Sequence, residues 1–599
     1  MKVTVRATGA VLGHASEQLL SNNIEAYETT IPELLSDRLR NPKFAPPENP
    51  QTGVALEWEP IGNTMTGFAC RLVPGMYMSG REAQLIHNYT QQSRAGIVQA
   101  GVPVRAGELY EVEMWARAQH APVTVSVALQ LPGQRVPAQS QGELLYDLAH
   151  WHRRTCVLQS PGDGPASFQI TVPGDSRVVI DQVHLRPVGE THVTSALLAA
   201  VQAVPCPVLR FPGGCVTCTY HWEHGTGPVH LRPVCDDAVF KYKVHYDFGT
   251  DEYLDLCAAR GIRPLLTLNT STATPEQAGA WAAYVRQWYA ARGLPIPAAY
   301  FMVGNENYGI HEIGHMTGEM YVAQLREFAP AVRAAYPEAR VLAIGEYVSG
   351  GLREGQDTPW RSLLIEQAAD CFDALVVTRY SGAPDDLPLP EAMAAVANAL
   401  ADKEADLLAQ VRTLADAHLD RTIGIVEWNY WTRASHNDHA GFYEPNDIRH
   451  CLYSAGFLNA LCRLGDIVEL AAFYSLVNTM GTVHIHAGQF RLTDLVKVFT
   501  LYAEALPAEV LALQVDAPSL TEKRAAVDAV FLRKAGVIYG FLLNLSAHEA
   551  AEVSLEGLGI FTEARGVTAQ AILEPVTEIA LAVVGGRITL PPMSIVRVR

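Results

Sequence analysis

Short apolar runs alternate with longer segments of helical periodicity between about residues 190 and 505. Apolar runs of this kind are typical of parallel strands buried on both faces, so the alternation predicts βα units. Seven runs predict strands, at residues 208–211, 265–269, 300–303, 341–344, 374–377, 423–426 and 470–474. An earlier run at residues 11–17 brings the number to eight, which closes a (β/α)8 barrel.

Two of the intervening segments show where a helix begins and how its apolar face runs. The segment at residues 274–292 opens with Thr-Pro-Glu, an N-cap residue followed by proline in the first helical turn. Residues 446–464 carry apolar side chains at helical spacing.

On both sides of this region the apolar positions alternate with a period of two, and Gly and Pro mark the turns. Such a pattern is typical of β-sandwiches. We therefore predict an α/β protein in four parts. These are an N-terminal segment with the first barrel strand (1–45), an inserted β-sandwich resembling a carbohydrate-binding module (46–189), the (β/α)8 TIM barrel (190–505) and a C-terminal β-sandwich (506–599).

Two of the predicted strands end in a carboxylate, Glu306 after the fourth and Glu427 after the seventh. Cleavage of a glycosidic bond with retention needs one acid and one nucleophilic carboxylate about 5–5.5 Å apart, and strand ends of a barrel share one mouth. We predict Glu306 as the general acid/base and Glu427 as the nucleophile. The alternative is that either is an ion-paired residue of the rim. Glu346, which ends the fifth strand, is predicted to be structural or substrate-binding.

A family resemblance rests on several motifs taken together. The motif at residues 209–215, Leu-Arg-Phe-Pro-Gly-Gly-Cys, resembles a signature of family 51 glycoside hydrolases, typified by α-L-arabinofuranosidases. The motifs around Glu306 and Glu427 look like the family's acid/base and nucleophile motifs, and residues 12–19 are a looser match to its first-strand motif.

The resemblance implies roles for further side chains. Arg210 would support the nucleophile, Asn305 would bind the sugar 2-hydroxyl, and Tyr380 would hydrogen-bond Glu427. Glu17 and Cys215 would contact the furanose ring. The aromatic rings of Trp222 and Trp428 either stack on sugar or simply pack.

The sequence departs from the family pattern at Cys215, where the family usually has Asn, at Thr378, where it has His, and at Val426, where it has an acidic residue. These departures leave the sugar open. We expect hydrolysis of terminal α-L-arabinofuranosyl groups from oligosaccharides, with a galactofuranosidase or an endo-β-glucanase as alternatives. A carbohydrate-binding protein without catalysis is the alternative from another class; the presence of both carboxylates argues against it.

The composition and net charge of the 599-residue chain limit the classes of partner that it can bind. A net charge of −18 disfavours nucleic acid and anionic membrane surfaces, which need basic patches. The first residues lack an apolar signal segment and no stretch suits a membrane span, so we expect a cytoplasmic protein. The resemblance further suggests a homo-oligomer.

The ten scattered cysteines suit reduced core thiols. Cys215 and Cys218 form a CxxC motif near His221, His224 and His230, which raises the alternative of a zinc or redox site. No second ligand pair at metal spacing accompanies it. We therefore predict neither a metal nor a cofactor, with Cys215 facing substrate and Cys218 in the core.

Overall fold

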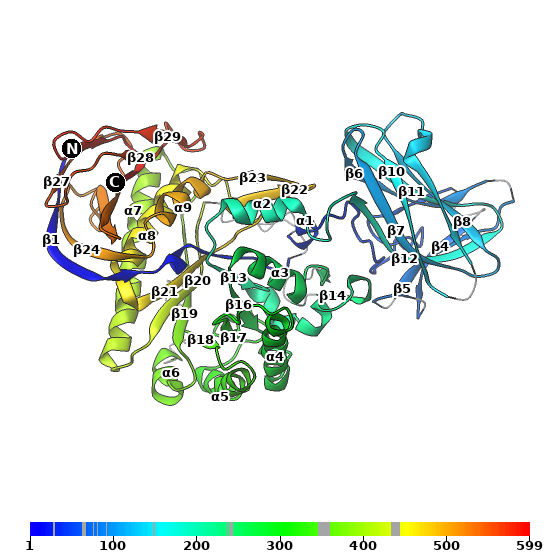
Figure 1. Cartoon of the computed structure of the whole chain (residues 1–599), viewed down its shortest axis with the longest axis horizontal. Helices are drawn as coiled ribbons and strands as arrows, with labels where there is room; N and C mark the ends of the chain where they lie inside the picture. Colours follow the sequence, from blue (N-terminus) through cyan, green and yellow to red (C-terminus); the bar gives the residue numbers. More distant parts are fainter. Residues whose placement is uncertain are drawn as a thin grey trace.

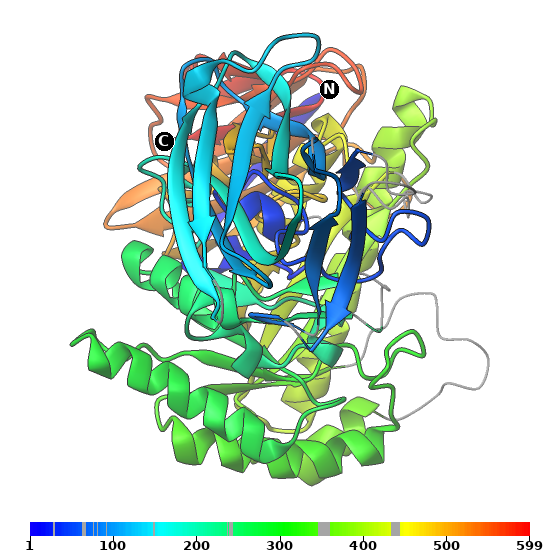
Figure 2. The ribbon, with the colours of Figure 1, turned by 90° about the vertical axis from the view of Figure 1, so that its right-hand side faces the viewer.

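The computed structural model describes the 599-residue chain except for residues 28–29, 63–67, 76, 81, 92, 148–149, 237, 239–242, 346–359 and 433–443. Three bodies follow one another across the long axis of the molecule (Figure 1). A β-rich body made by the two chain ends lies on one side, the barrel in the middle and the inserted β-sandwich on the other side. Figure 2 views the molecule from the side of the sandwich, which there stands in front of the barrel.

Eight parallel strands close a barrel, as the sequence predicts. Their order around the barrel is β13, β16, β17, β18, β19, β20, β21 and β2. The strands are β2 (Ser21–Asn23), β13 (Val208–Phe211), β16 (Arg263–Leu268), β17 (Tyr300–Val303), β18 (Arg340–Ile344), β19 (Ala374–Gly382), β20 (Thr422–Trp431) and β21 (Val468–Phe473). All residues of β13 and β17 are buried, because side chains fill the barrel on one face and pack under helices on the other.

The first barrel strand is not the one predicted. Residues 11–17 lie in and just after β1 (Lys2–Ala15), which pairs with strands of the C-terminal body. The barrel position belongs to β2, a Ser-Asn-Asn segment that has no apolar run. Its polar side chains are buried because they are hydrogen-bonded: Asn23 Nδ2 donates to the carbonyls of Val426 (2.9 Å) and Ala472 (3.2 Å).

Helices cover the outside of the barrel. They are α2 (Ser195–Ala203), α3 (Thr250–Arg260), α4 (Pro275–Ala291), α5 (Gly318–Ala335), α6 (Trp360–Ala368), α7 (Leu389–Asp416), α8 (Ile448–Arg463) and α9 (Leu495–Ala503). The predicted start of α4 is confirmed, because Thr274 caps it by accepting a hydrogen bond from the Gln277 amide. No helix in the described part of the chain has the length and apolar character needed to cross a membrane.

The insertion consists of two five-stranded sheets. One has the order β10, β7, β12, β5, β4 and the other β3, β6, β11, β8, β9. Alternate residues face the core between the sheets, as in β8, where Val123, Val125, Val127 and Leu129 are buried. The strands are β3 (Glu59–Ile61), β4 (Phe68–Pro74), β5 (Glu82–Asn88), β6 (Ala95–Val104), β7 (Leu109–Ala118), β8 (Val123–Gln130), β9 (Gln141–Tyr146), β10 (His152–Gln159), β11 (Gly164–Val172) and β12 (Ser176–Pro187).

The C-terminal body is a nine-stranded sheet that includes β1. Its other strands are β24 (Ala508–Asp516), β25 (Val527–Lys534), β26 (Val537–Asn544), β27 (Ala551–Glu556), β28 (Ala564–Thr568), β29 (Thr577–Ala580), β30 (Arg587–Leu590) and β31 (Ser594–Val598). Strands far apart in the sheet share one core, which contains Val5, Phe531, Val553 and Ile588. The amino-terminal strand therefore ties the two ends of the chain together beside the barrel.

Candidate active site

The carboxyl ends of β17 and β20 bring Glu306 and Glu427 to the same mouth of the barrel. After β17 the backbone turns sharply, with φ of 81° at Gly304 and 41° at Glu306. A positive φ is strained for a residue with a long side chain, and such strain concentrates at functional sites. In β20 an extra residue, Val426, lies opposite the step from Val377 to Thr378, a bulge of the kind that redirects a neighbouring side chain.

Arg210 joins the two strand ends. This fully buried guanidinium lies at the end of β13 and donates to Glu427 Oε1, to Asn305 Oδ1 (2.7 Å) and to Thr267 Oγ1 (2.9 Å). Tyr380 of β19 donates its hydroxyl to the other oxygen of Glu427 at 2.8 Å. Both carboxylate oxygens of Glu427 thus accept hydrogen bonds, and the donor to Oε1 is the permanently charged guanidinium of Arg210.

Two glycines after β13 let the backbone approach the carboxylates. A Cβ at Gly214 would lie 2.8 Å from Glu427 Oε1, and one at Gly213 would lie 2.4 Å from Glu25 Cγ. The Gly214 amide donates to Glu25 Oε1 at 3.0 Å, and Tyr474 donates to Oε2 at 2.5 Å. Only glycine fits this approach, which explains the Gly-Gly pair of the sequence motif.

Glu306 accepts hydrogen bonds from three side chains. Thr378 donates to Oε1 at 2.6 Å and Tyr308 to the same oxygen at 2.8 Å. His311 Nε2 lies 3.2 Å from Oε2. The side chain of Glu306 is 18% exposed, so the carboxyl group borders solvent at the mouth.

A further carboxylate, Glu312, lies close to Glu306 and is buried. Asn305 Nδ2 donates to its Oε1 at 3.0 Å, and Cys218 Sγ lies 3.1 Å from its Oε2. Asn305 therefore bridges Arg210 on one side and Glu312 on the other.

These surroundings shift the pKa values of the carboxyl groups in different directions. Burial, together with the charge of Glu427, raises the pKa of Glu25 to about 8. Burial and the charge of Glu306 also raise the pKa of Glu427, although Arg210 opposes the shift. Burial acts upward on the pKa of Glu306 as well, but hydrogen bonds from His311, Thr378 and Tyr308 outweigh it and leave that pKa below its ordinary value.

The lowered pKa keeps Glu306 ionised in the free protein at neutral pH, because three donors stabilise its carboxylate form. The partner His311 shows the reciprocal effect: its hydrogen bond to Glu306 raises its own pKa.

The predicted site residues fall into two groups. Arg210, Cys215, Asn305 and Tyr380 lie beside the paired carboxylates. Glu17, Trp222 and Trp428 do not. Glu346 lies outside the described residues.

Glu17 is exposed in the turn before β2, next to Gln18, which accepts from Tyr300 at the start of β17. It therefore lies at the amino ends of the strands, opposite the mouth. The Trp222 indole packs against α4, with its ring 6.4 Å from that of Trp281. Trp428 is fully buried against Phe457 of α8, since neighbouring residues of a strand face opposite ways.

Sequence reasoning missed Glu25, Tyr474, Tyr308, His311 and Glu312. The signal for Glu25 was available, because it is a carboxylate just past a barrel strand, but β2 itself has no apolar run. His311 and Glu312 lie on a loop whose path depends on the turn at Glu306, where the Gly309 amide donates back to the Glu306 carbonyl. No local sequence pattern indicates that path.

The CxxC motif and the nearby histidines make their contacts with other groups. Cys218 faces Glu312, whereas His224 lies 3.7 Å from Cys235, and the His230 ring stacks on Trp115 of the insertion. The described contacts therefore do not assemble the predicted alternative of a CxxC and histidine zinc site.

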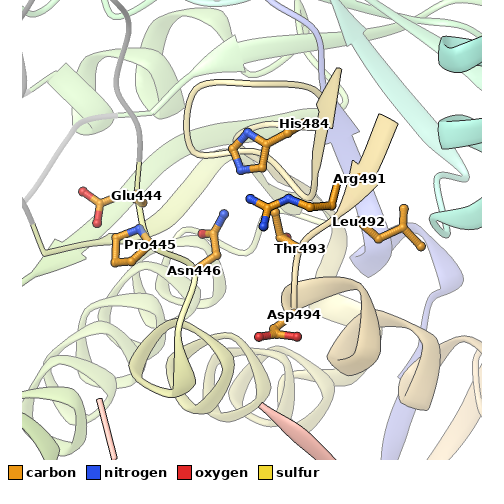
Figure 3. Close-up of a pocket in the computed structure, with 8 residues that line it drawn as sticks. All are labelled: Glu444, Pro445, Asn446, His484, Arg491, Leu492, Thr493 and Asp494. Carbon is orange, nitrogen blue, oxygen red and sulfur yellow. The ribbon is translucent and has the colours of Figure 1, made fainter. Parts of the chain in front are cut away.

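A separate cavity of about 380 Å³ opens where the β22–β23 hairpin meets the starts of α8 and α9 (Figure 3). β22 spans Val483–His486 and β23 spans Gln489–Leu492. The lining of the cavity is polar and includes Glu444, Asn446, His484, Arg491 and Asp494. None of the carboxylates around Arg210 lines this cavity, so it is distinct from the barrel mouth.

Two family models match the chain. The α-L-arabinofuranosidase 1 domain matches residues 200–358, and the α-L-arabinofuranosidase C-terminal domain matches residues 427–576. The first covers β13 to β18 with Arg210 and Glu306, and the second begins at Glu427. Both carboxylates of the candidate pair thus fall within the matched regions.

Similar proteins carry the same description. A probable α-L-arabinofuranosidase C of Aspergillus niger is 28% identical over 302 residues, which are 47% of this chain and 59% of that protein. An intracellular exo-α-L-arabinofuranosidase of Bacteroides ovatus is 25% identical over 385 residues, 59% of this chain and 73% of that protein. The chain thus spans about three fifths of the length of the Aspergillus relative.

A solved structure shares the fold along the whole chain. The arabinose-bound MgGH51 α-L-arabinofuranosidase matches with a TM-score of 0.71 and 14% identity, covering 100% of this chain and 99% of that one. The sequence matches are consistent with the closed barrel and with the paired carboxylates at its strand ends. The chain thus carries two α-L-arabinofuranosidase domains in sequence, and it shares the fold of a solved family 51 structure.

Proposed function

We propose that the protein is a retaining exo-glycosidase that removes terminal α-L-arabinofuranosyl groups from oligosaccharides by double displacement. The observation that carries this proposal is the pair Glu306 and Glu427 at the ends of the fourth and seventh barrel strands, connected through Arg210 and Asn305. The names of the matched domains and of the Bacteroides relative support the sugar and the exo action.

In the first half-reaction the Glu427 carboxylate attacks the anomeric carbon and forms an ester. The bond from that carbon to the glycosidic oxygen breaks, and the oxygen takes a proton from Glu306. Arg210 and Tyr380 hold the attacking carboxylate in place through its two oxygens. Because they fix its orientation before substrate arrives, they reduce the entropic cost of reaching the transition state.

In the second half-reaction a water molecule attacks the same carbon. Its proton passes to Glu306, and the ester bond breaks with its electron pair returning to the Glu427 carboxylate. The configuration at the anomeric carbon is inverted twice and hence retained.

Glu25, Asn305 and Cys215 surround the pair and are the side chains that we propose to contact the sugar. A carboxyl group with a pKa of about 8 is protonated at neutral pH and can both donate to and accept from a sugar hydroxyl. The Asn305 amide and the half-buried Cys215 thiol border the same space. The cytoplasmic location and a homo-oligomer stay predictions, and glycan binding and packing stay alternatives for the insertion.

Azide rescue tests the roles of the two carboxylates with 4-nitrophenyl α-L-arabinofuranoside. Azide should restore turnover to Glu427→Gly and give the β-azide, because it attacks the substrate once. In Glu306→Gly it should give the α-azide, because it attacks the ester. Loss of turnover in Glu427→Gly without rescue, in a folded variant of an active enzyme, would contradict the nucleophile assignment.

A matched pair of substitutions tests which early glutamate belongs to the site. Glu25→Gln should lower kcat/KM by about five- to a hundredfold, since leaving a buried hydrogen-bond partner unsatisfied costs roughly 1–3 kcal/mol. Glu17→Gln should leave kcat/KM unchanged, because Glu17 is exposed at the other end of the barrel. A panel of nitrophenyl furanosides and β-glucans compares arabinofuranoside with the galactofuranoside and glucan alternatives; preference for either would replace the proposed sugar.

A further inference from the structure

Four metal-binding side chains meet at the barrel mouth, and their donor atoms come from two segments. Cys215 begins the 3-10 turn after the Gly-Gly pair, while Glu306, His311 and Glu312 lie on the loop after β17. The thiol sulfur, the imidazole nitrogen and one oxygen of each carboxylate all lie within 4.8 Å of one another. His311 Nε2 lies 3.2 Å from Glu306 and 3.8 Å from Glu312.

Carboxyl groups outnumber guanidinium and imidazole groups in the surroundings. Glu25, Glu306, Glu312 and Glu427 all lie at the mouth, and three of them are buried by more than nine tenths. The guanidinium of Arg210 is engaged by Glu427. The half of the mouth around Glu306 and Glu312 thus holds two carboxylates facing one imidazole, an arrangement that favours a multivalent cation.

The donor set selects the kind of cation. One thiol, one imidazole and two carboxylates suit a borderline ion such as Zn²⁺, whereas Mg²⁺ and Ca²⁺ take oxygen ligands. Around a tetrahedral Zn²⁺ with bonds of about 2.0–2.3 Å, donors lie roughly 3.5 Å apart. The two His311 distances bracket that value, and the widest separation closes with a shift of about an ångström.

We propose that Cys215, Glu306, His311 and Glu312 form a Zn²⁺ site that switches the enzyme off. The His311 side chain is 56% exposed, so the ion has a route from solvent. An ion held on Glu306 occupies the carboxylate that the proposed mechanism needs as acid and base. Zn²⁺ is therefore a reversible inhibitor that competes with substrate, and a chelator restores activity.

Metal binding can be measured without turnover, which keeps this inference separate from the proposed function. Calorimetric titration of the full chain with Zn²⁺ should give a stoichiometry of one ion per chain. Co²⁺ in place of Zn²⁺ should produce a thiolate-to-cobalt charge-transfer band in the near ultraviolet and the visible bands of a tetrahedral ion. The band reports the sulfur ligand directly.

Variants locate the ion. Cys215→Ser should abolish the charge-transfer band, and both Cys215→Ser and His311→Ala should weaken Zn²⁺ binding at least roughly a hundredfold, since even outer-sphere partners contribute 10–100-fold. Cys235→Ser is the matched control, because Cys235 is a half-buried thiol beside His224 and away from this cluster. It should bind Zn²⁺ like the parent. Thermal unfolding curves verify that each variant is folded.

Three results would overturn the inference: no binding, a Co²⁺ spectrum without the thiolate band, or Zn²⁺ affinity that Cys215→Ser and His311→Ala leave intact. If Cys235→Ser alone lost the ion, the site would lie at Cys235 and His224. Inactivity of the protein on arabinofuranosides would refute the proposed sugar and leave the metal measurements valid.

Discussion

Replacement of Arg210 by methionine tests the electrostatic support of the nucleophile. Arg210→Met keeps most of the side-chain volume but removes the buried cation and its hydrogen bonds to Glu427, Asn305 and Thr267. Glu427 then keeps the hydroxyl of Tyr380 but loses its charge partner. Since Arg210 holds the pKa of Glu427 down against burial, the substitution raises that pKa further.

The magnitude follows from the cost of leaving a buried charge unpaired, about 3–5 kcal/mol. If that cost falls on the ionised Glu427 required for attack, kcat/KM drops by roughly two to four orders of magnitude, because about 1.4 kcal/mol corresponds to tenfold. The sign of the pH effect is also fixed. An ionised nucleophile is lost as pH falls through its pKa, so a higher pKa moves the acidic limb of the kcat/KM profile to higher pH.

The assay is the pH profile of kcat/KM on 4-nitrophenyl α-L-arabinofuranoside, with thermal unfolding as the measure of folding. Arg210→Lys keeps the charge but not the forked geometry. It should return the acidic limb of the kcat/KM profile part of the way to its position in the parent. Thr267→Val removes one acceptor of Arg210 without touching the charge and should change kcat/KM by less than about tenfold. A folded Arg210→Met with an unmoved acidic limb would refute this account of Glu427.

Other substitutions separate chemistry from packing. Tyr380→Phe removes the 2.8 Å hydrogen bond to Glu427 and should lower kcat/KM about ten- to a hundredfold, with little change in melting temperature; an unchanged rate would remove Tyr380 from the site. Glu25→Gln tests the raised pKa through stability. A carboxyl group whose pKa rises from 4.5 to about 8 on folding destabilises the fold progressively as pH increases between those values, by up to about 1.4 kcal/mol per pH unit. The melting temperature of Glu25→Gln should therefore gain on that of the parent from pH 5 to 8, and a constant difference would contradict the shift. Trp428→Phe should lower stability by about 0.5–3 kcal/mol and leave KM unchanged, because the indole packs against α8; a changed KM would indicate sugar contact.

The predictable part of the fold is the part in which burial dictates composition. Strands such as β17, buried on both faces, must be apolar throughout, so their apolar runs are visible in the sequence. β2 escapes this rule because its asparagines are buried through hydrogen bonds to neighbouring strands. The sequence therefore predicts the first barrel strand at residues 11–17, which puts Glu17 in the place that the fold gives to Glu25.

The candidate site divides in the same way. Residues attached directly to strand ends, such as Arg210, Asn305 and Tyr380, could be placed from the strand count and the motifs. His311 and Glu312 depend on a loop that turns back over Glu306 with a positive φ, and the direction of that turn is a tertiary property. Trp428 could not be assigned from its position next to Glu427, because the strand pleat directs it outward.

In the free site Glu306 and Glu427 favour protonation states opposite to those that the proposed mechanism requires at the moment of cleavage. Glu306 is stabilised as a carboxylate by His311, Thr378 and Tyr308, whereas burial and the charge of Glu306 favour a proton on Glu427. Interacting carboxyl groups titrate as a pair, so a proton gained by one lowers the pKa of the other. A substrate whose glycosidic oxygen replaces a donor at Glu306 raises the pKa of that group and, once Glu306 is protonated, removes the charge that opposes ionisation of Glu427. Binding of the leaving group beside Glu306 thereby prepares both carboxyl groups at once, the acid by protonation and the nucleophile by ionisation against Arg210.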